Sequence, residues 1–179
     1  MTAKPPASRP AAAAETERDS AAGFAIRSAE LRDVVAIVQM IRELAVFERL
    51  EHLVEATPEK LRPCLFGERP VAEALVAEVQ GQAIAFALYF TNFSTFLARP
   101  GLYLEDLYVQ PAHRAKGVGK ALLTRLASLA AERGCGRFEW SVLDWNANAI
   151  GFYERMGATL LPDWRICRIT GDALRAYAP

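Results

Sequence analysis

The sequence has few of the residues on which metal, redox and hydrolytic sites depend. Its 179 residues include two histidines and three cysteines. Cys64, Cys135 and Cys167 show neither metal-ligand nor redox spacing, so we expect them to fill the core of a protein kept in a reducing compartment. Two histidines are too few for a histidine-rich metal site or an obvious hydrolase triad. We therefore expect a cytoplasmic protein without a metal.

The sequence also lacks an excess of either charge and a long apolar run near its start. Lys plus Arg and Asp plus Glu both number 21, so composition predicts no general affinity for nucleic acid or anionic membranes. Residues 1–22 are rich in Ala, Pro and charge, and contain no stretch typical of a secretory signal or membrane span. We expect a disordered tail at 1–22 and a single domain at 23–179, which is long enough to bury a substantial core.

Apolar periodicity predicts alternating helices and strands from Gly23 onward. Strands are expected at Phe24–Arg27, Val71–Val79, Gln82–Phe93, Leu102–Val109, Phe138–Leu143 and Trp164–Ile169. Helices are expected after an N-cap at Asp33, after Thr57 and Pro58, from Gly117 to Gly134, and from Asn146 to Met156. One strand-helix-strand crossover in a mostly antiparallel set predicts a mixed sheet flanked by helices. Residues 92–101 are long for a hairpin loop, and we expect them to form one wall of a substrate cleft.

The most informative stretch is the basic loop that follows the strand at Leu102–Val109. The next helix begins at two glycines, Gly117 and Gly119. Glycine lacks the Cβ that would hold an oxyanion away from the backbone, and the amides of a first helical turn have no carbonyl partner. The positive charges beside these amides come from Arg114, Lys116 and Lys120. The stretch therefore predicts a site for a phosphate-bearing ligand.

Two common phosphate loops do not fit this stretch. A Walker A loop requires glycine where Arg114 stands and Ser or Thr where Ala121 stands. A dinucleotide G-x-G-x-x-G that began at Gly117 would require glycine in place of Leu122. The loop does fit Arg-x-x-Gly-x-Gly, which ends at Gly119.

With the strand before it, this loop resembles the acyl-CoA loop of the GNAT N-acetyltransferase superfamily. The resemblance covers about residues 24–175 and extends to the branch of diamine (spermidine/spermine) and thialysine acetyltransferases. Its motifs are I-R-E-L-A-V-F-E from Ile41, L-Y-L-E-D-L-Y-V from Leu102, R-A-K-G-V-G from Arg114 and W-N-A-N-A-I-G-F-Y-E-R-M-G-A from Trp145. It implies an α/β (α+β) fold: a mixed, mostly antiparallel sheet of six to seven strands, flanked by helices and splayed between the fourth and fifth strands.

The resemblance also implies acetyl-CoA as the cosubstrate. Strand amides would pair with the pantetheine arm, and loop amides would surround the diphosphate. The implied contacts are Leu107, Tyr108, Val109, Arg114, Ala115, Lys116, Gly117, Val118, Gly119, Lys120, Asn146, Ala147, Asn148, Ala149 and Tyr153. Ala115 stands where glycine is common in such loops, and we expect it to be tolerated if its φ is negative.

Acetyl transfer to an amine requires two proton movements. An ammonium of pKa about 10 must lose a proton before attack, and a thiolate whose thiol resembles cysteine, of pKa about 8.5, must gain one. Glu105 matches the family's proposed base, acting through water, and Tyr153 matches its acid. Glu105 also fits a solvated edge carboxylate or an electrostatic anchor for the amine, and Tyr153 fits a packed aromatic residue. Asp106 should point to the face opposite Glu105 and be structural, because strand side chains alternate.

The acceptor is expected to lie against Phe47, Glu48, Glu105 and Glu139. Glu48 matches an acidic residue that the diamine branch uses against a second amine, although Glu48 and Glu139 also fit ordinary solvated charges. Phe47 replaces a common tyrosine, and 95–97 replace the D-x-W motif of polyamine enzymes. These departures favour thialysine, a lysine-like amino acid or a short diamine over a long polyamine.

Two other functions remain as alternatives to small-amine acetylation. The first is acetylation of a protein lysine or N-terminus, which the zero net charge disfavours. The second is a CoA-binding regulator without turnover, which the presence of both Glu105 and Tyr153 disfavours. The family resemblance implies a homodimer, and we expect neither nucleic acid nor a membrane as a partner.

Overall fold

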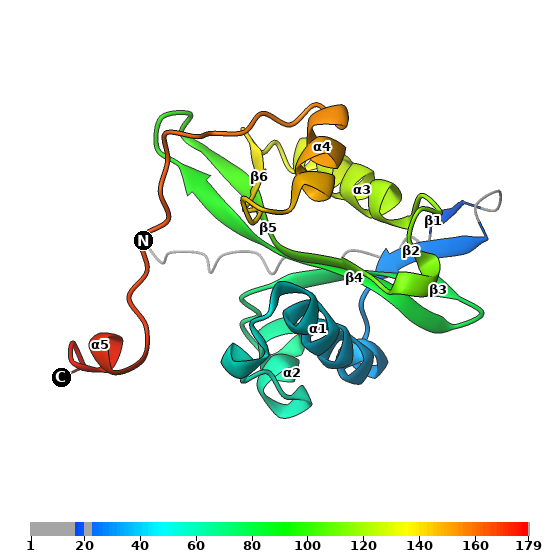
Figure 1. Cartoon of the computed structure of the whole chain (residues 1–179), viewed down its shortest axis with the longest axis horizontal. Helices are drawn as coiled ribbons and strands as arrows, with labels where there is room; N and C mark the ends of the chain where they lie inside the picture. Colours follow the sequence, from blue (N-terminus) through cyan, green and yellow to red (C-terminus); the bar gives the residue numbers. More distant parts are fainter. Residues whose placement is uncertain (1–16, 20–22, 179) are drawn as a thin grey trace, which may run out of the picture. The chain divides into compact units, whose positions relative to one another are not determined.

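The computed structural model describes residues 17–19 and 23–178, which form two compact units (Figure 1). One unit ends at Ser141 and the other begins at Val142, so the single domain predicted for 23–179 stays a prediction. Glu17–Asp19 forms strand β1, which pairs with strand β2. The predicted disordered tail is therefore wrong at these three residues, and the rest of the tail lies outside the described residues.

The first unit is built on a sheet of six strands in the described chain, ordered from β1 to β6. The remaining strands are β2 (Phe24–Ser28), β3 (Glu73–Val79), β4 (Gln82–Ser94), β5 (Arg99–Val109) and β6 (Phe138–Trp140). Neighbouring strands are antiparallel except β5 and β6, which are parallel. Helix α3 (Val118–Glu132) connects that parallel pair. The predicted mixed sheet with one crossover is confirmed.

Helices cover both faces of this sheet (Figure 1). Helices α1 (Val34–Glu48) and α2 (Pro58–Phe66) lie on one face, and α3 lies on the other. Short 3-10 helices occur at η1 (Leu31–Asp33), η2 (Glu51–Leu53) and η3 (Pro111–His113). The second unit contains helices α4 (Ala147–Arg155) and α5 (Gly171–Arg175).

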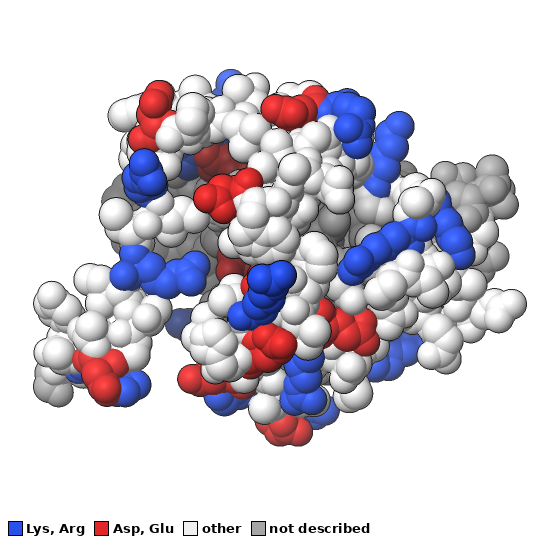
Figure 2. All heavy atoms as spheres, viewed as in Figure 1, with Lys and Arg blue, Asp and Glu red and all other residues white. Residues whose placement is uncertain are grey.

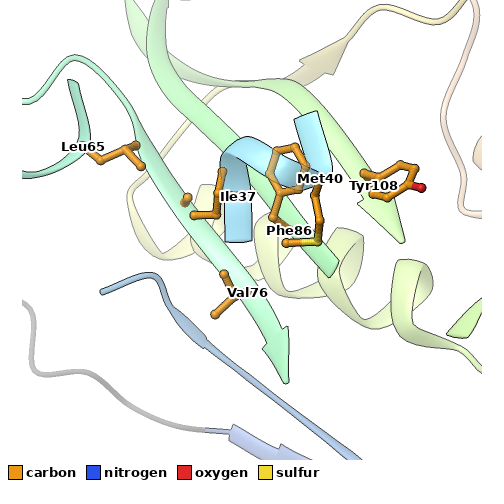
Figure 3. Close-up of a cluster of buried hydrophobic side chains, with 7 residues drawn as sticks. Ile37, Met40, Leu65, Val76, Phe86 and Tyr108 are labelled. Carbon is orange, nitrogen blue, oxygen red and sulfur yellow. The ribbon is translucent and has the colours of Figure 1, made fainter. Parts of the chain in front are cut away.

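A buried apolar cluster holds α1 and α2 on the sheet (Figure 3). Its members are Ile37 and Met40 from α1, Leu65 from α2, and Ala74, Val76, Phe86 and Tyr108 from the strands. Fully burying one side chain of this size contributes about 1.5–3 kcal/mol. The cluster therefore fixes the course of α1, and with it the position of Phe47 and Glu48 at the C-terminal end of that helix.

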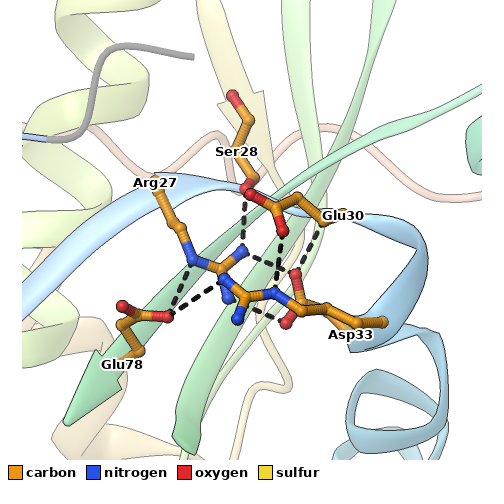
Figure 4. Close-up of polar contacts among 6 residues, drawn as sticks. Arg27, Ser28, Glu30, Asp33 and Glu78 are labelled. Atoms are coloured by element: carbon orange, nitrogen blue, oxygen red, sulfur yellow. Dashed lines mark hydrogen bonds and ion pairs between the residues drawn. The ribbon is translucent and has the colours of Figure 1, made fainter. Parts of the chain in front are cut away.

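A buried ion pair fixes the other end of α1 (Figure 4). The guanidinium of Arg27 donates to both carboxylate oxygens of Asp33, at 2.6 and 2.9 Å, and its Nε donates to Glu78 at 2.8 Å. Asp33 also accepts a bond from the backbone N–H of Glu30 at 2.7 Å. Its carboxylate therefore completes a capping box on η1 and makes no capping bond to α1. Asp33 is the N-cap residue of α1, as predicted, but its carboxylate does not cap that helix, because Arg27 and the N–H of Glu30 hold it.

Other capping predictions are confirmed. The Thr57 hydroxyl accepts a bond from the N–H of Lys60 at 3.3 Å, and Pro58 is the first residue of α2. Gly134 follows α3 with a φ of +66°, a left-handed value that glycine adopts without strain. These positions depend on local chemistry, which the sequence displays directly.

Three predicted features at strand ends are wrong. Strand β4 ends at Ser94 and strand β5 begins at Arg99. The connection between them is therefore residues 95–98, shorter than the predicted 92–101. Strand β6 ends at Trp140, before the predicted end at Leu143. No strand forms at 164–169 in the described chain. Cys167 is exposed within that stretch, which rules out its predicted core-filling role.

The surface of the described residues mixes both charges. Figure 2 shows acidic and basic side chains interspersed over the visible face, which agrees with the equal numbers of each sign in the sequence. Within 17–19 and 23–178, no helix has the length and apolar character needed to cross a membrane.

Candidate active site

The loop between β5 and α3 presents backbone amides that the helix itself does not use. Gly117 is the N-cap of α3 with a φ of +84°, and it has no side chain with which to cap the helix. The N–H of Ala121 makes the first helical bond, to the Gly117 carbonyl at 2.9 Å. The amides of Val118, Gly119 and Lys120 precede it and have no partner within the helix. A Cβ built on Gly117 would meet no atom within 4 Å, so no other part of the described chain packs against that position.

The charged side chains of this loop have different surroundings. Lys116 and Lys120 are exposed, and neither forms a hydrogen bond or ion pair with another described residue. Arg114 instead donates from Nε to the Val109 carbonyl at 2.9 Å. Its guanidinium carbon lies 5.5 Å from the ring centre of Phe47 and 5.4 Å from that of Tyr108. The two lysines therefore leave their ammonium groups available at this loop, whereas the guanidinium of Arg114 lies against two rings.

Ala115 adopts a left-handed conformation within this loop, with a φ of +59°. The condition under which we expected this alanine to be tolerated, a negative φ, is not met. For a residue with a Cβ this conformation costs about 1–2 kcal/mol. The loop therefore carries backbone strain at the position where glycine is common in similar loops.

Strands β5 and β6 separate beside this loop. Their parallel ladder contains three pairs and ends at Leu104 and Trp140. Among the described residues no further strand pairs with 105–109 on that side of β5. The predicted splay between the two strands is thus present, and the backbone of Leu107, Tyr108 and Val109 runs along it.

A β-bulge in β5 interrupts the alternation of side chains at Glu105, one of the predicted catalytic residues. Leu104 pairs with Tyr89 and Asp106 pairs with Leu88, which leaves Glu105 as the extra residue. Bulges of this kind often re-aim a side chain beside a functional site. The bulge occurs where the β5–β6 ladder ends.

Register shows that the bulge places Glu105 and Asp106 on the same face. Tyr103 pairs with Phe90 and its ring contacts that of Phe90, and alternation puts Glu105 on the face of Tyr103. Asp106 pairs with Leu88, which packs against the cluster beneath α1. Leu88 and Phe90 share a face by the same alternation. The prediction that Asp106 points away from Glu105 is therefore wrong, because the extra residue resets the alternation.

Three carboxylates gather on this α1 side of β5. Burial, followed by the charges of Glu105 and Glu48, raises the pKa of Asp106 to about 6. Burial also raises the pKa of Glu48, the last residue of α1. Clustered negative charge of this kind attracts a cation and disfavours a second anion. Asp106 is the residue that reasoning from sequence assigned to structure alone.

The sequence does contain a signal for this arrangement. Leu102 and Leu104 keep a spacing of two, and Leu107 and Val109 keep the same spacing, but the spacing from Leu104 to Leu107 is three. Side chains of Leu107 and Val109 lie 3.8 and 3.7 Å from a Cβ built on Gly119, so they face α3. One inserted residue between the two apolar pairs is what a bulge requires.

Glu139, a predicted substrate-binding residue, lies in β6 and already has partners. Its carboxylate accepts a bond from the Asn92 amide at 3.1 Å and pairs with Arg137 Nε at 2.8 Å. Phe47 is exposed and stacks on Arg114. The negative charge of Glu139 is thus largely compensated, in contrast to that of the three carboxylates beside α1.

The second unit carries the remaining predicted residues. The Asn146 side chain caps α4 by accepting a bond from the N–H of Ala149 at 3.2 Å, and Ala147 and Asn148 form the first turn. The ring of Tyr153 lies 5.4 Å from that of Phe152, centre to centre. The roles predicted for these residues stay predictions.

Comparison with known proteins gives consistent similarities. The model of the acetyltransferase (GNAT) family matches residues 37–158. An L-ornithine N5-acetyltransferase of Arabidopsis thaliana is 37% identical, over 84% of this chain and 86% of that protein. A thialysine N-epsilon-acetyltransferase of Mus musculus is 40% identical, over 86% of this chain and 96% of that protein. The solved structure of an integron cassette protein from V. cholerae has a TM-score of 0.72 and 25% identity, and covers 86% of this chain and 96% of its own.

Proposed function

Because the chain belongs to the GNAT family and is an N-acetyltransferase, we propose that it transfers an acetyl group from acetyl-CoA to a primary amine of a small molecule. The acceptor class is a short diamine, a polyamine or a lysine-like amino acid. The transfer is direct, within a ternary complex of the chain and both substrates. We propose a cytoplasmic localisation, because the three cysteines lack metal or redox spacing and so indicate a reducing compartment.

The cosubstrate fits the groups available between β5 and α3. The free amides of Val118, Gly119 and Lys120, with the ammonium groups of Lys116 and Lys120, would hold the diphosphate. One helix terminus contributes only about 0.3–1 kcal/mol to an exposed anion, so affinity requires these groups together. The unpaired side of β5 would bind the pantetheine arm along 107–109.

The acceptor side carries the proposal, because Glu48, Glu105 and Asp106 lie together beside α1. A cationic amine is the partner that compensates such a cluster. Relatives that are named for acetylating ornithine and thialysine, both amino acids with a side-chain amine, agree with this chemistry. A second amine or an amino acid head group would lie near Glu48.

The reaction needs no covalent enzyme intermediate. The acceptor nitrogen, once deprotonated, forms a bond to the acetyl carbon while the carbon–sulfur bond breaks. Glu105 would hold the amine, or its water, at the carbonyl, and the hydroxyl of Tyr153 would protonate the departing sulfur. Both residues are carried over from the family resemblance.

A substrate panel tests the proposal. Purified chain is incubated with acetyl-CoA and, separately, ornithine, thialysine, lysine, putrescine, spermidine and a lysine-containing peptide. Release of CoA and mass-spectrometric identification of the product should show acetylation of short diamines or lysine-like amino acids. Acetylation of the peptide alone would point to the protein-lysine alternative, and binding of CoA with no product would point to the regulator.

We further propose that the chain acts as a homodimer in which the segment at 164–169 packs against a second copy. Trp164 is 76% exposed and Ile166 71% exposed, and this segment has no strand partner in the described chain. Exposed apolar side chains on an unpaired extended segment are a common dimer interface. Sedimentation of the wild type and of Trp164→Ser with Ile166→Ser should show a dimer and a monomer. A monomeric wild type would contradict the proposal.

A further inference from the structure

Asp106 lies on the α1 side of β5 together with Glu105, and its surroundings differ from those of Glu105. Glu105 is exposed, whereas Asp106 is half-buried on the same face of β5. Asp106 pairs with Leu88, which packs against the apolar cluster beneath α1. The two adjacent carboxylates therefore face one site in different degrees of contact with water.

We propose that the carboxylate of Asp106 is a further catalytic residue, which takes the proton of the acceptor ammonium while Glu105 and Glu48 bind that ammonium. This inference rests on the proposed function and assigns the proton transfer within it. The bulge is what makes the assignment possible, because regular alternation would turn Asp106 to the opposite face of the sheet.

The charges around Asp106 suit it to this step. Glu105 on its own strand and Glu48 on α1 act on it, while Glu43 and Arg114 act on Tyr108, two residues further along β5. Burial and the two neighbouring carboxylates raise the pKa of Asp106 from 3.8 to about 6. A shift of two units makes the carboxylate a base about 100-fold stronger. A base with a pKa just below neutral remains mostly ionised at pH 7 and accepts a proton most effectively there.

The proton balance of the step is complete. The ammonium gives one proton to Asp106, and the neutral nitrogen attacks the thioester carbon. When the carbon–sulfur bond breaks, the second proton leaves the nitrogen and the sulfur gains one, so the products are the amide and the CoA thiol. Asp106 then releases its proton to water. The net change is one proton released for each amide formed.

The pH dependence of kcat/KM for the acceptor tests this role, since that ratio reports groups of the free enzyme. In the wild type kcat/KM should fall tenfold per pH unit below about pH 6. Asp106→Asn should lower kcat/KM by about 100-fold or more at pH 8 and should abolish the fall of kcat/KM below pH 6. Glu105→Gln is the matched control. In this variant the fall of kcat/KM at acidic pH should persist but move to lower pH, because a neighbouring charge that raises the pKa of Asp106 is gone. The affinity for acetyl-CoA should be unchanged in both variants.

A measurement on the wild-type chain keeps the proposal testable if Asp106→Asn does not fold. Carbon-13 NMR of the carboxyl groups should show Asp106 titrating near pH 6, and Glu105→Gln should lower that midpoint. The assignment would be overturned if the fall of kcat/KM at acidic pH survived in Asp106→Asn and disappeared in Glu105→Gln. A titration midpoint of Asp106 near pH 4 would overturn it as well. Failure of the proposed function looks different, because the wild type would then acetylate none of the acceptors.

Discussion

Replacing Arg27 by methionine should strongly destabilise the first unit. Arg27 and Asp33 are each only 5% exposed, and the guanidinium supplies two of the three hydrogen bonds described for the Asp33 carboxylate. Removing one partner of a buried ion pair leaves an uncompensated charge and costs about 3–5 kcal/mol. Urea unfolding at pH 7, followed by circular dichroism, should show a loss of that size in the free energy of unfolding.

The loss should depend on pH in a defined direction. Burial alone would raise the pKa of Asp33, but the bonds and charge of Arg27 and the Glu30 N–H outweigh it and hold the pKa below its usual value. In the wild type this contribution to stability is present above the unfolded pKa, about 3.9, and is lost as the pH falls through the lower folded value. In Arg27→Met the buried carboxylate has a raised pKa and gains stability on protonation. The difference between the two proteins should therefore be largest near neutral pH, shrink as the pH falls through the raised pKa of the variant, and shrink further below about pH 4.

Arg32→Met is the matched control for this experiment. Arg32 pairs with Glu30 at 2.7 Å, but the two side chains are 59% and 50% exposed. Exposed pairs contribute about 0–1 kcal/mol. If Arg27→Met costs no more than Arg32→Met, the argument from the buried charge is wrong.

Three further variants probe the loop and the site. Tyr153→Phe should lower kcat by about 100-fold or more, since acid catalysis contributes that much, and calorimetry should show an unchanged affinity for acetyl-CoA. An unaltered kcat would show that Tyr153 is not the acid. Ala115→Gly should raise the free energy of unfolding by about 0.5–1 kcal/mol, because relief of the left-handed strain exceeds the added entropy of the unfolded chain, and a lower melting temperature would refute this. Glu48→Gln should raise KM for a diamine and leave KM for acetyl-CoA as it is, so an unchanged diamine KM would place Glu48 outside the acceptor site.

Features that depend on local chemistry were predictable from the sequence. Thr57 and Pro58 begin a helix because a hydroxyl can cap the first turn and proline needs no N–H there. Gly117 and Gly134 lie at the two ends of α3. Both have a positive φ, which glycine adopts without strain. The order of strands followed from apolar alternation and one crossover. The sequence therefore predicted the mixed sheet and the glycine at the start of α3, while anion binding by the loop stays a prediction.

Features that depend on partners distant in sequence were not predictable in the same way. Asp33 is the N-cap residue that the sequence predicted, but its carboxylate binds Arg27 and the Glu30 N–H instead of capping α1. The extended pattern at 164–169 predicted a strand, yet strand formation needs a neighbour with free backbone groups. The face of Asp106 depended on a bulge that is defined only by pairing with β4.

Arg114 has structural partners of its own, beside the contact with the diphosphate that the motif predicts. Its position at the head of Arg-x-x-Gly-x-Gly suggests a ligand for the diphosphate, but its guanidinium lies against the rings of Phe47 and Tyr108 and its Nε donates to the Val109 carbonyl. Each ring contact of this kind contributes about 0.5–1 kcal/mol at an exposed site. A lysine would keep the charge but has neither a planar group to stack nor an Nε–H to reach the carbonyl. The arginine therefore joins the loop between β5 and α3 to the end of α1, so one side chain holds both the loop that we propose for the donor and the helix that carries Glu48.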